Sequence, residues 1–138
     1  MNSLLPIALV LIASTAYGIW YQRTRGRVVV KGGKKKAGLI TAQMIGAPLG
    51  TRASLVQFSS AFCTPCRATR ALLENVVEGL SDVVHIDIDA EDHLELVREL
   101  NILSTPTTLI LDSKGHEVGR AVGAPKREQV LNALAAIR

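Results

Sequence analysis

The fold of this 138-residue chain can be inferred from one run of its sequence, Ala53-Ser54-Leu55-Val56-Gln57-Phe58-Ser59-Ser60-Ala61-Phe62-Cys63-Thr64-Pro65-Cys66-Arg67. The first seven residues of this run are mostly apolar and uncharged, which predicts a buried central strand. After Thr64, apolar residues recur at helical spacing, at Ala68, Ala71, Leu72, Val76 and Leu80. A helix is therefore expected from Thr64 to about Gly79–Ser81, with the two cysteines of the chain at its start.

A cysteine at the start of a helix favours the thiolate form. Helix N-termini present free N–H groups and a positive partial charge, which stabilise a negative sulfur. The thiolate is the form that attacks disulfides. The spacing therefore predicts a thiol–disulfide exchange centre in which Cys63 attacks and Cys66, one turn later, resolves the mixed disulfide.

Two other interpretations of the cysteine pair stay open. A structural zinc site needs four ligands, usually from two Cys/His pairs. The chain has no second cysteine pair, and His85, His93 and His116 are scattered along it. The second alternative is a pair of inert buried thiols or a purely structural disulfide. The strand–CxxC–helix order favours redox chemistry, and we expect no metal and no organic cofactor.

The segment 58–67 resembles the active-site segment of the thioredoxin family, with Phe62 at a position where tryptophan is commoner. About 40 residues later, Ser104-Thr105-Pro106-Thr107 looks like the cis-proline loop of that family. The sequence 112–118 resembles its hairpin turn, and Val122-Gly123 its glycine near the active site. The resemblance covers about residues 50–138. It implies a thioredoxin fold, an α/β domain with a mixed central sheet flanked by helices.

The resemblance also implies roles for particular residues. Thr64 and Pro65 would set the redox poise, and Thr105-Pro106 would carry a cis peptide whose backbone pairs with an extended substrate. An ordinary trans proline at a strand start is the alternative for Pro106. The implied partners are protein disulfide substrates and a thiol electron donor. A thioredoxin-fold adaptor or redox sensor without turnover is the alternative function.

One position departs from the family pattern. Thioredoxins often bury an aspartate in the strand before the CxxC motif, where this chain has Gln57, and a lysine on the opposite strand, where it has His85. An amide cannot act as a base, but an imidazole can. We hypothesise that His85 takes over part of the proton transfer to Cys66. The alternative is that His85 is simply a packed strand residue.

The other elements of the domain follow from periodicity. Strands are expected at 83–89, 107–111 and 117–122, with a turn at 113–115. Helices are expected from about Ala90, through Leu94 and Leu100, and from Pro125 to the C-terminus. A short helix at 41–45 and a short edge strand at 28–30 complete the expected map.

Residues 1–22 carry no charged side chain, and Leu4 to Trp20 are mostly apolar. As a helix, these 17 residues span roughly 25 Å, the low end for crossing a bilayer. Tyr17, Trp20 and Tyr21 cluster at the C-terminal end, as in an interfacial aromatic belt. We expect a single-pass membrane helix. A cleaved signal peptide is the alternative, although no basic residue precedes the apolar core.

Seven basic residues follow this helix and none precedes it. The positive-inside rule then predicts that the domain lies on the cytoplasmic face, with the extracytoplasmic face as the alternative. Residues 23–38 are expected to be a basic juxtamembrane linker and 39–138 the thioredoxin-like domain. Anchor and domain together resemble a membrane-anchored thioredoxin-like protein of the bacterial type. Residues 1–73 hold ten Lys/Arg and no Asp or Glu. Residues 23–36 have no aromatic residue, so we expect no nucleic-acid partner.

Overall fold

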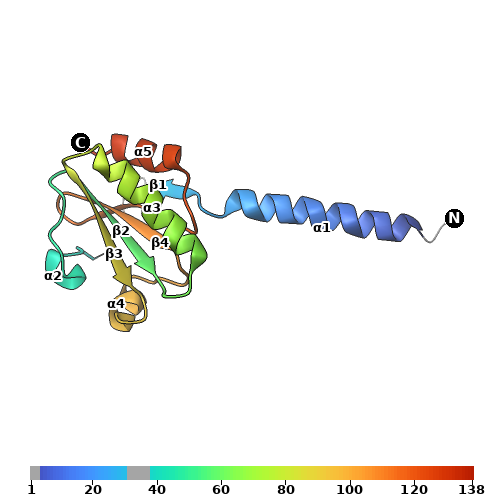
Figure 1. Ribbon diagram of the computed structural model, residues 1–138, viewed down its shortest axis with the longest axis horizontal. Coiled ribbons are helices and arrows are strands. Elements are labelled where there is room, and N and C mark those ends of the chain that lie inside the picture. Colours follow the sequence, from blue (N-terminus) through green and yellow to red (C-terminus); the bar gives the residue numbers. More distant parts are fainter. Residues whose placement is uncertain (1–3, 31–37) are drawn as a thin grey trace.

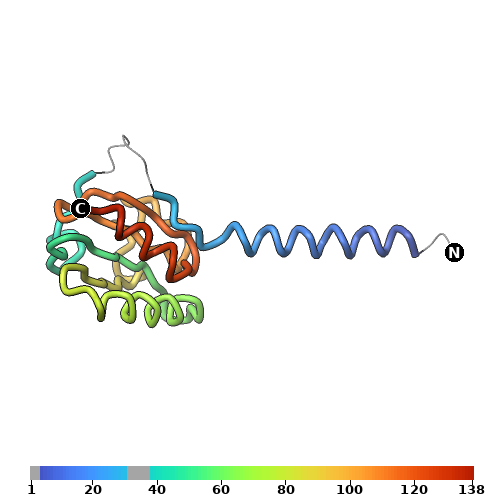
Figure 2. The backbone as a smooth tube through the Cα atoms, turned by 90° about the horizontal axis from the view of Figure 1, so that it is seen from above, coloured from blue at the N-terminus to red at the C-terminus, as the bar shows by residue number. Residues whose placement is uncertain are grey.

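The computed structural model describes residues 4–30 and 38–138. Its elements follow one another in the order α1 (Leu4–Thr24), β1 (Val28–Val30), α2 (Ala42–Ile45), β2 (Ala53–Ser59), α3 (Thr64–Glu78), β3 (Val83–Asp89), α4 (Leu94–Glu99), β4 (Thr107–Asp112), β5 (Glu117–Val122) and α5 (Arg127–Ala135). Helices cover both faces of one central sheet, and α1 projects away from this domain (Figures 1 and 2). The expected mixed sheet flanked by helices is confirmed.

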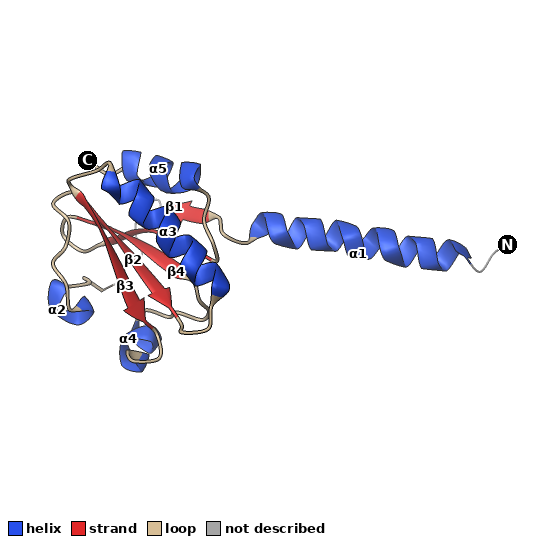
Figure 3. Ribbon diagram, in the orientation of Figure 1, coloured by secondary structure: helices blue, strands red, loops and turns tan. Residues whose placement is uncertain are grey.

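The five strands lie in the order β1-β5-β4-β2-β3. Strand β2 is parallel to β3 and antiparallel to β4. The β4–β5 hairpin is antiparallel, and β1 closes the edge by pairing antiparallel with β5. Figure 3 shows β2, which leads to the cysteines, between β3 and β4. All seven β2 residues are buried, which explains why the sequence of this strand carries no charge.

Side chains of β2 alternate between two apolar cores, as the pleat of a strand requires. Val56 and Phe58 belong to the core that also holds Leu96 and Leu100 of the α4 region. Ala53 and Leu55 belong to the core shared with α3 and α5. Gln57 follows the same parity as Ala53 and Leu55, so this amide faces the helix that carries the cysteines.

Helix α3 is amphipathic and has defined ends. Its buried residues recur along one face at Cys66, Thr69, Leu73 and Val76. Cys63 is the N-cap and Gly79 the C-cap, so the expected bounds of this helix are confirmed. The helix packs on β2 and β3 and thereby holds its first turn over the carboxyl end of the parallel strand pair.

Three element boundaries differ from the expected ones. Helix α4 begins at Leu94 rather than near Ala90, because the Asp89 carboxylate accepts the Glu91 N–H in a turn before it. Helix α5 begins at Arg127, two residues after Pro125. Helix α1 continues to Thr24, two residues beyond the expected span.

The expected edge strand at Val28–Val30 is confirmed by its pairing with β5. These three residues of the expected linker therefore belong to the sheet of the domain. The remaining linker positions 31–37 lie outside the described residues. Helix α1 is long and apolar enough to cross a bilayer, and none of its side chains is buried against the domain. A signal peptide near an N-terminus has the same properties.

Candidate active site

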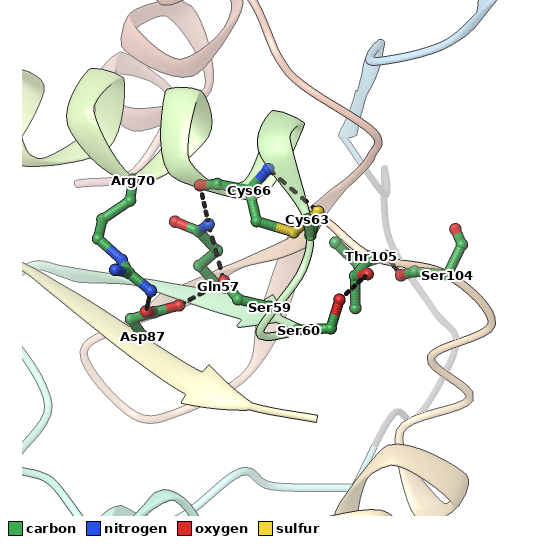
Figure 4. The surroundings of a disulfide bond; sticks show 10 residues. Gln57, Ser59, Ser60, Cys63, Cys66, Arg70, Asp87, Ser104 and Thr105 are labelled. Atoms are coloured by element: carbon green, nitrogen blue, oxygen red, sulfur yellow. Dashed lines mark hydrogen bonds and ion pairs between the residues drawn. A yellow bond between two sulfur atoms is a disulfide. The ribbon is translucent and has the colours of Figure 1, made fainter. Parts of the chain in front are cut away.

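Cys63 and Cys66 form a disulfide at the N-terminus of α3, with their Cα atoms 5.2 Å apart (Figure 4). Cys63 is the N-cap in an extended conformation, and its Sγ accepts a hydrogen bond from the Cys66 backbone N–H at 3.1 Å. Cys66 is buried, with 1% of its surface exposed, whereas Cys63 is only half-buried. Cys63 is therefore the sulfur that an incoming disulfide can reach.

The two residues between the cysteines lie in the first turn of α3 and are exposed. Pro65 supplies no N–H where the helix has no acceptor for one, and its fixed φ suits a first turn. The turn therefore keeps the Cys66 N–H directed at the Cys63 sulfur. That sulfur lies at the positive end of the helix dipole, which favours its thiolate.

The peptide bond between Thr105 and Pro106 is cis, which confirms the expectation for this loop. The Thr105 and Ser60 hydroxyls lie 3.3 Å apart within hydrogen-bonding distance, and this contact joins the loop to the segment before Cys63 (Figure 4). On its other side the Pro106 carbonyl accepts the Gly123 N–H at 2.8 Å. The glycine expected near the active site thus supports the proline loop.

Gln57 lies directly beneath the dithiol, fully buried. Its amide nitrogen donates to the Cys66 carbonyl oxygen at 2.9 Å and to Ser59 Oγ at 3.0 Å (Figure 4). Its amide oxygen lies 3.1 Å from His85 Nε2. The structure therefore brings together the Gln57 and His85 side chains that the sequence predicts to replace the aspartate–lysine pair.

These contacts fix the form of the His85 ring. A carbonyl oxygen can only accept, so the Gln57 nitrogen must face Cys66 and the Gln57 oxygen must face His85. His85 Nε2 therefore carries the hydrogen of this bond. Burial lowers the pKa of His85, partly offset by the charges of Asp87 and Glu74, so the ring is neutral near pH 7 with its lone pair on Nδ1.

Three further polar residues join this network, and the sequence analysis missed them. Ser59 Oγ donates to the Asp87 carboxylate at 2.6 Å, and Asp87 forms an ion pair with Arg70 of α3 (Figure 4). Asp87 stands two residues after His85 on the same face of β3 and directly opposite Gln57 in the register. The alternation in β3 was the signal that could have found it.

A groove of about 490 Å³ runs beside the dithiol. Its domain side is formed by the first turn of α3, the proline loop and the end of β5, including Pro65, Thr105, Pro106 and Gly123. Its other side is formed by the last residues of α1 and the turn after it, including Tyr21 and Arg25. The proline loop, which the family resemblance predicts to pair with an extended substrate, therefore lies along this groove.

The other histidines lie away from this site. His93 caps α4 and contacts the Asp89 carbonyl, and His116 pairs with Asp112 in the β4–β5 turn. Across residues 4–30 and 38–138, no group of three or more His, Cys, Asp or Glu side chains is arranged to hold a metal ion.

Sequence comparison finds relatives for the domain. The thioredoxin family model matches residues 47–136. Thioredoxin H2 of Arabidopsis thaliana is 30% identical over 74 residues, which are 54% of this chain and 55% of that protein. A thioredoxin of Mycoplasma genitalium is 27% identical over 56% of this chain and 76% of its own length. The match therefore spans about half of the plant relative.

Solved structures agree with the sequence match. The thioredoxin NaTrxh of Nicotiana alata is 26% identical, with a TM-score of 0.57 over 64% of this chain and 75% of that one. Fasciola hepatica thioredoxin has the same TM-score and 21% identity, covering 64% of this chain and 84% of its own. The architecture around the dithiol is therefore the thioredoxin fold.

Proposed function

The chain belongs to the thioredoxin family, and from that premise we propose that it is a thiol–disulfide oxidoreductase that exchanges protein disulfides through Cys63 and Cys66. The observation that carries this proposal is the position of Cys63. Its sulfur is accessible, caps the positive end of α3 and accepts the Cys66 N–H beside the cis-proline loop. These are the conditions that a nucleophilic thiolate needs.

The proposed cycle starts from the reduced dithiol. The Cys63 thiolate attacks one sulfur of the substrate disulfide, forms a mixed disulfide and releases the other sulfur as a thiolate. Cys66, after losing its proton, then attacks Cys63 Sγ, which forms the Cys63–Cys66 disulfide and releases the second substrate sulfur. The substrate gains two electrons and two protons, and an external thiol donor restores the dithiol. Run in reverse, the same steps install a disulfide.

The second step, the attack of Cys66 on Cys63 Sγ, depends on the residues around Cys66 because that cysteine is buried. The Cys66 sulfur must lose its proton while it is almost fully buried, which raises the cost of forming its thiolate. Gln57 holds the Cys66 backbone in place, and Ser59 links that amide to Asp87. We propose that His85, acting through Gln57, contributes to this step, and that Thr64 and Pro65 tune the redox poise.

The same proposal includes attachment to a membrane. Helix α1 has 21 residues, mean hydropathy 1.7 and no buried side chain, and the basic residues follow it. We propose that α1 anchors the chain with the domain on the cytoplasmic face, where cytosolic thiols would recharge it. On the extracytoplasmic face, the domain would instead handle envelope disulfides.

An adaptor or redox sensor without turnover is the competing function, and a trapping experiment separates the two. The reduced full-length chain should reduce a generic protein disulfide repeatedly when a thiol donor is supplied. Cys66→Ser should accumulate a mixed disulfide through Cys63, because the resolving sulfur is missing, and Cys63→Ser should accumulate none. If the folded wild-type chain shows no turnover and the Cys66→Ser variant traps no mixed disulfide, the protein is an adaptor or sensor and not an oxidoreductase.

A further inference from the structure

The end of α1 forms a wall of the groove beside the dithiol. Tyr21 and Arg25 line the same groove as Pro65 and Pro106, although these residues are far apart in sequence. Figures 1 and 2 both show that α3 begins on the side of the domain from which α1 extends. The surface that receives the substrate therefore adjoins the helix proposed to enter the membrane.

Short backbone contacts hold α1 in this position. The Gly26 N–H donates to the Val122 carbonyl oxygen at 2.8 Å, and the N–H of Gly123, the residue directly after β5, donates to the Pro106 carbonyl oxygen. A Cβ atom at Gly26, whose φ is +81°, would overlap the Ala124 carbonyl oxygen, and one at Gly123, whose φ is +91°, would lie 3.3 Å from the Gly26 nitrogen. The two glycines let the turn after α1 pack directly on the residues that support the proline loop.

The aromatic residues of α1 mark where the bilayer surface would lie. Tyr17 stacks on Tyr21 and lies against Trp20, and all three side chains are exposed. Tyr and Trp in such a cluster take the headgroup level. The Arg25 guanidinium lies over the Tyr21 ring, 4.8 Å from its centroid. A helix rises about 6 Å from residue 21 to residue 25, so the groove extends from the headgroup level to about one helical turn beyond it.

A substrate class for this dithiol rests on the proposed function, the exchange of protein disulfides through Cys63 and Cys66. We propose that the groove receives disulfides in juxtamembrane segments of integral membrane proteins, at the headgroup level, in preference to disulfides of soluble proteins. An extended segment leaving the bilayer beside α1 passes between Tyr21 and Arg25 on one side and the proline loop on the other. Its disulfide then meets the Cys63 sulfur, and exchange follows the balanced steps given above.

Co-reconstitution of the full-length chain with designed peptides tests this proposal. Three probes carry the same small disulfide loop. In the near probe the loop lies about four residues outside the apolar span of a membrane-spanning peptide, and in the distant probe it lies about 25 residues outside the same span. The third probe is a soluble peptide with the same loop. The pre-reduced chain is mixed with each probe at equal surface or solution concentration, quenched with acid and alkylated. The near loop should be reduced about fivefold or more faster than the distant loop, and substitutions in the groove wall separate this preference from the effect of tether length.

Substitutions at the end of α1 and in the turn after it test whether this wall contributes to the preference. Tyr21→Ala and Arg25→Ala should each lower the ratio of near-loop to distant-loop rates toward one, because they remove side chains that line the groove. Arg23→Ala is the matched control. It removes the same charge from the same helix end, but its side chain lies about 200° around the helix from position 25 and does not line the groove. The ratio should stay at the wild-type value in this variant.

The outcomes separate the two levels of the proposal. Equal rates on near and distant loops, a soluble loop reduced as fast as the near one, or an equal loss in Arg23→Ala would overturn the juxtamembrane preference and leave the oxidoreductase intact. Failure to reduce any of the three probes would contradict the proposed function itself.

Discussion

His85 is partly buried, and its protonation therefore affects the stability of the fold. The histidine pKa is lowered in the folded chain by burial, from an ordinary value of 6.5. The folded state therefore binds fewer protons than the unfolded state near that pH, and the free energy of unfolding must fall as the pH decreases through about 6.5. One proton contributes at most about 1.4 kcal/mol per pH unit.

His85→Gln should remove this slope while keeping a donor for the Gln57 oxygen. Urea unfolding of the full-length chain between pH 5 and pH 7.5 measures it. Asp82, whose pKa is lowered from 3.8 by its hydrogen bond with Arg52, loses its stabilising effect at more acidic pH and does not interfere. His93→Gln, at an exposed helix cap, should keep the wild-type slope. An identical slope in His85→Gln would contradict the assignment to His85.

The same substitution site tests the proton-transfer hypothesis. The rate at which Cys66 resolves a mixed disulfide should change its pH profile between pH 6 and 8 in His85→Leu if His85 assists proton release. A profile of unchanged shape would leave His85 as a packed strand residue that orients Gln57 through the 3.1 Å contact.

At the scale of elements, the junction between α1 and the domain depends on Gly26. An alanine there would need a left-handed φ near +81° and would overlap the Ala124 carbonyl. Gly26→Ala should therefore lower the free energy of unfolding by about 1–3 kcal/mol. Hydrogen exchange of the backbone N–H of residue 26, which donates to the Val122 carbonyl oxygen, should also become faster.

Gly79→Ala is the control for that substitution. Gly79 caps α3 with a negative φ, and an added Cβ would meet no atom within 4 Å. Unfolding and exchange in this variant should match the wild type. A wild-type stability and exchange rate in Gly26→Ala would show that the turn after α1 does not pack on the proline loop.

Local patterns were enough to predict most elements of the domain. The uncharged run 53–59 and the helical spacing after Thr64 gave β2 and α3 with their observed bounds, because burial and amphipathicity act over a few neighbouring residues. The contacts of Ser59 with Asp87 and of Gly26 with Val122 were missed. These contacts depend on strand register and on packing between distant segments, which no local pattern specifies.

For the whole molecule, the uneven distribution of charge is the observation that carries the proposal of a domain on the cytoplasmic face of the membrane. Residues 1–73 hold ten Lys/Arg and no Asp or Glu. Seven of these ten basic residues lie between positions 23 and 36, at the end of α1 and directly after it. Such a cluster is retained on the cytoplasmic side. Because Cys63 and Cys66 are the only cysteines in the sequence, a thiol reagent reports the position of the domain directly.

A membrane-impermeant maleimide applied to intact, mildly reduced cells should leave the chain unlabelled, and permeabilised cells should label it. The doubly substituted Cys63→Ser, Cys66→Ser chain should stay unlabelled in both. Membrane fractions should retain a chain of the full 14.8 kDa, since cleavage after α1 would release a smaller one. Labelling in intact cells would reverse the charge argument and assign the dithiol to envelope disulfides. The groove would then bind juxtamembrane segments on the outer face, because the end of α1 lines the groove whichever side of the membrane the domain occupies.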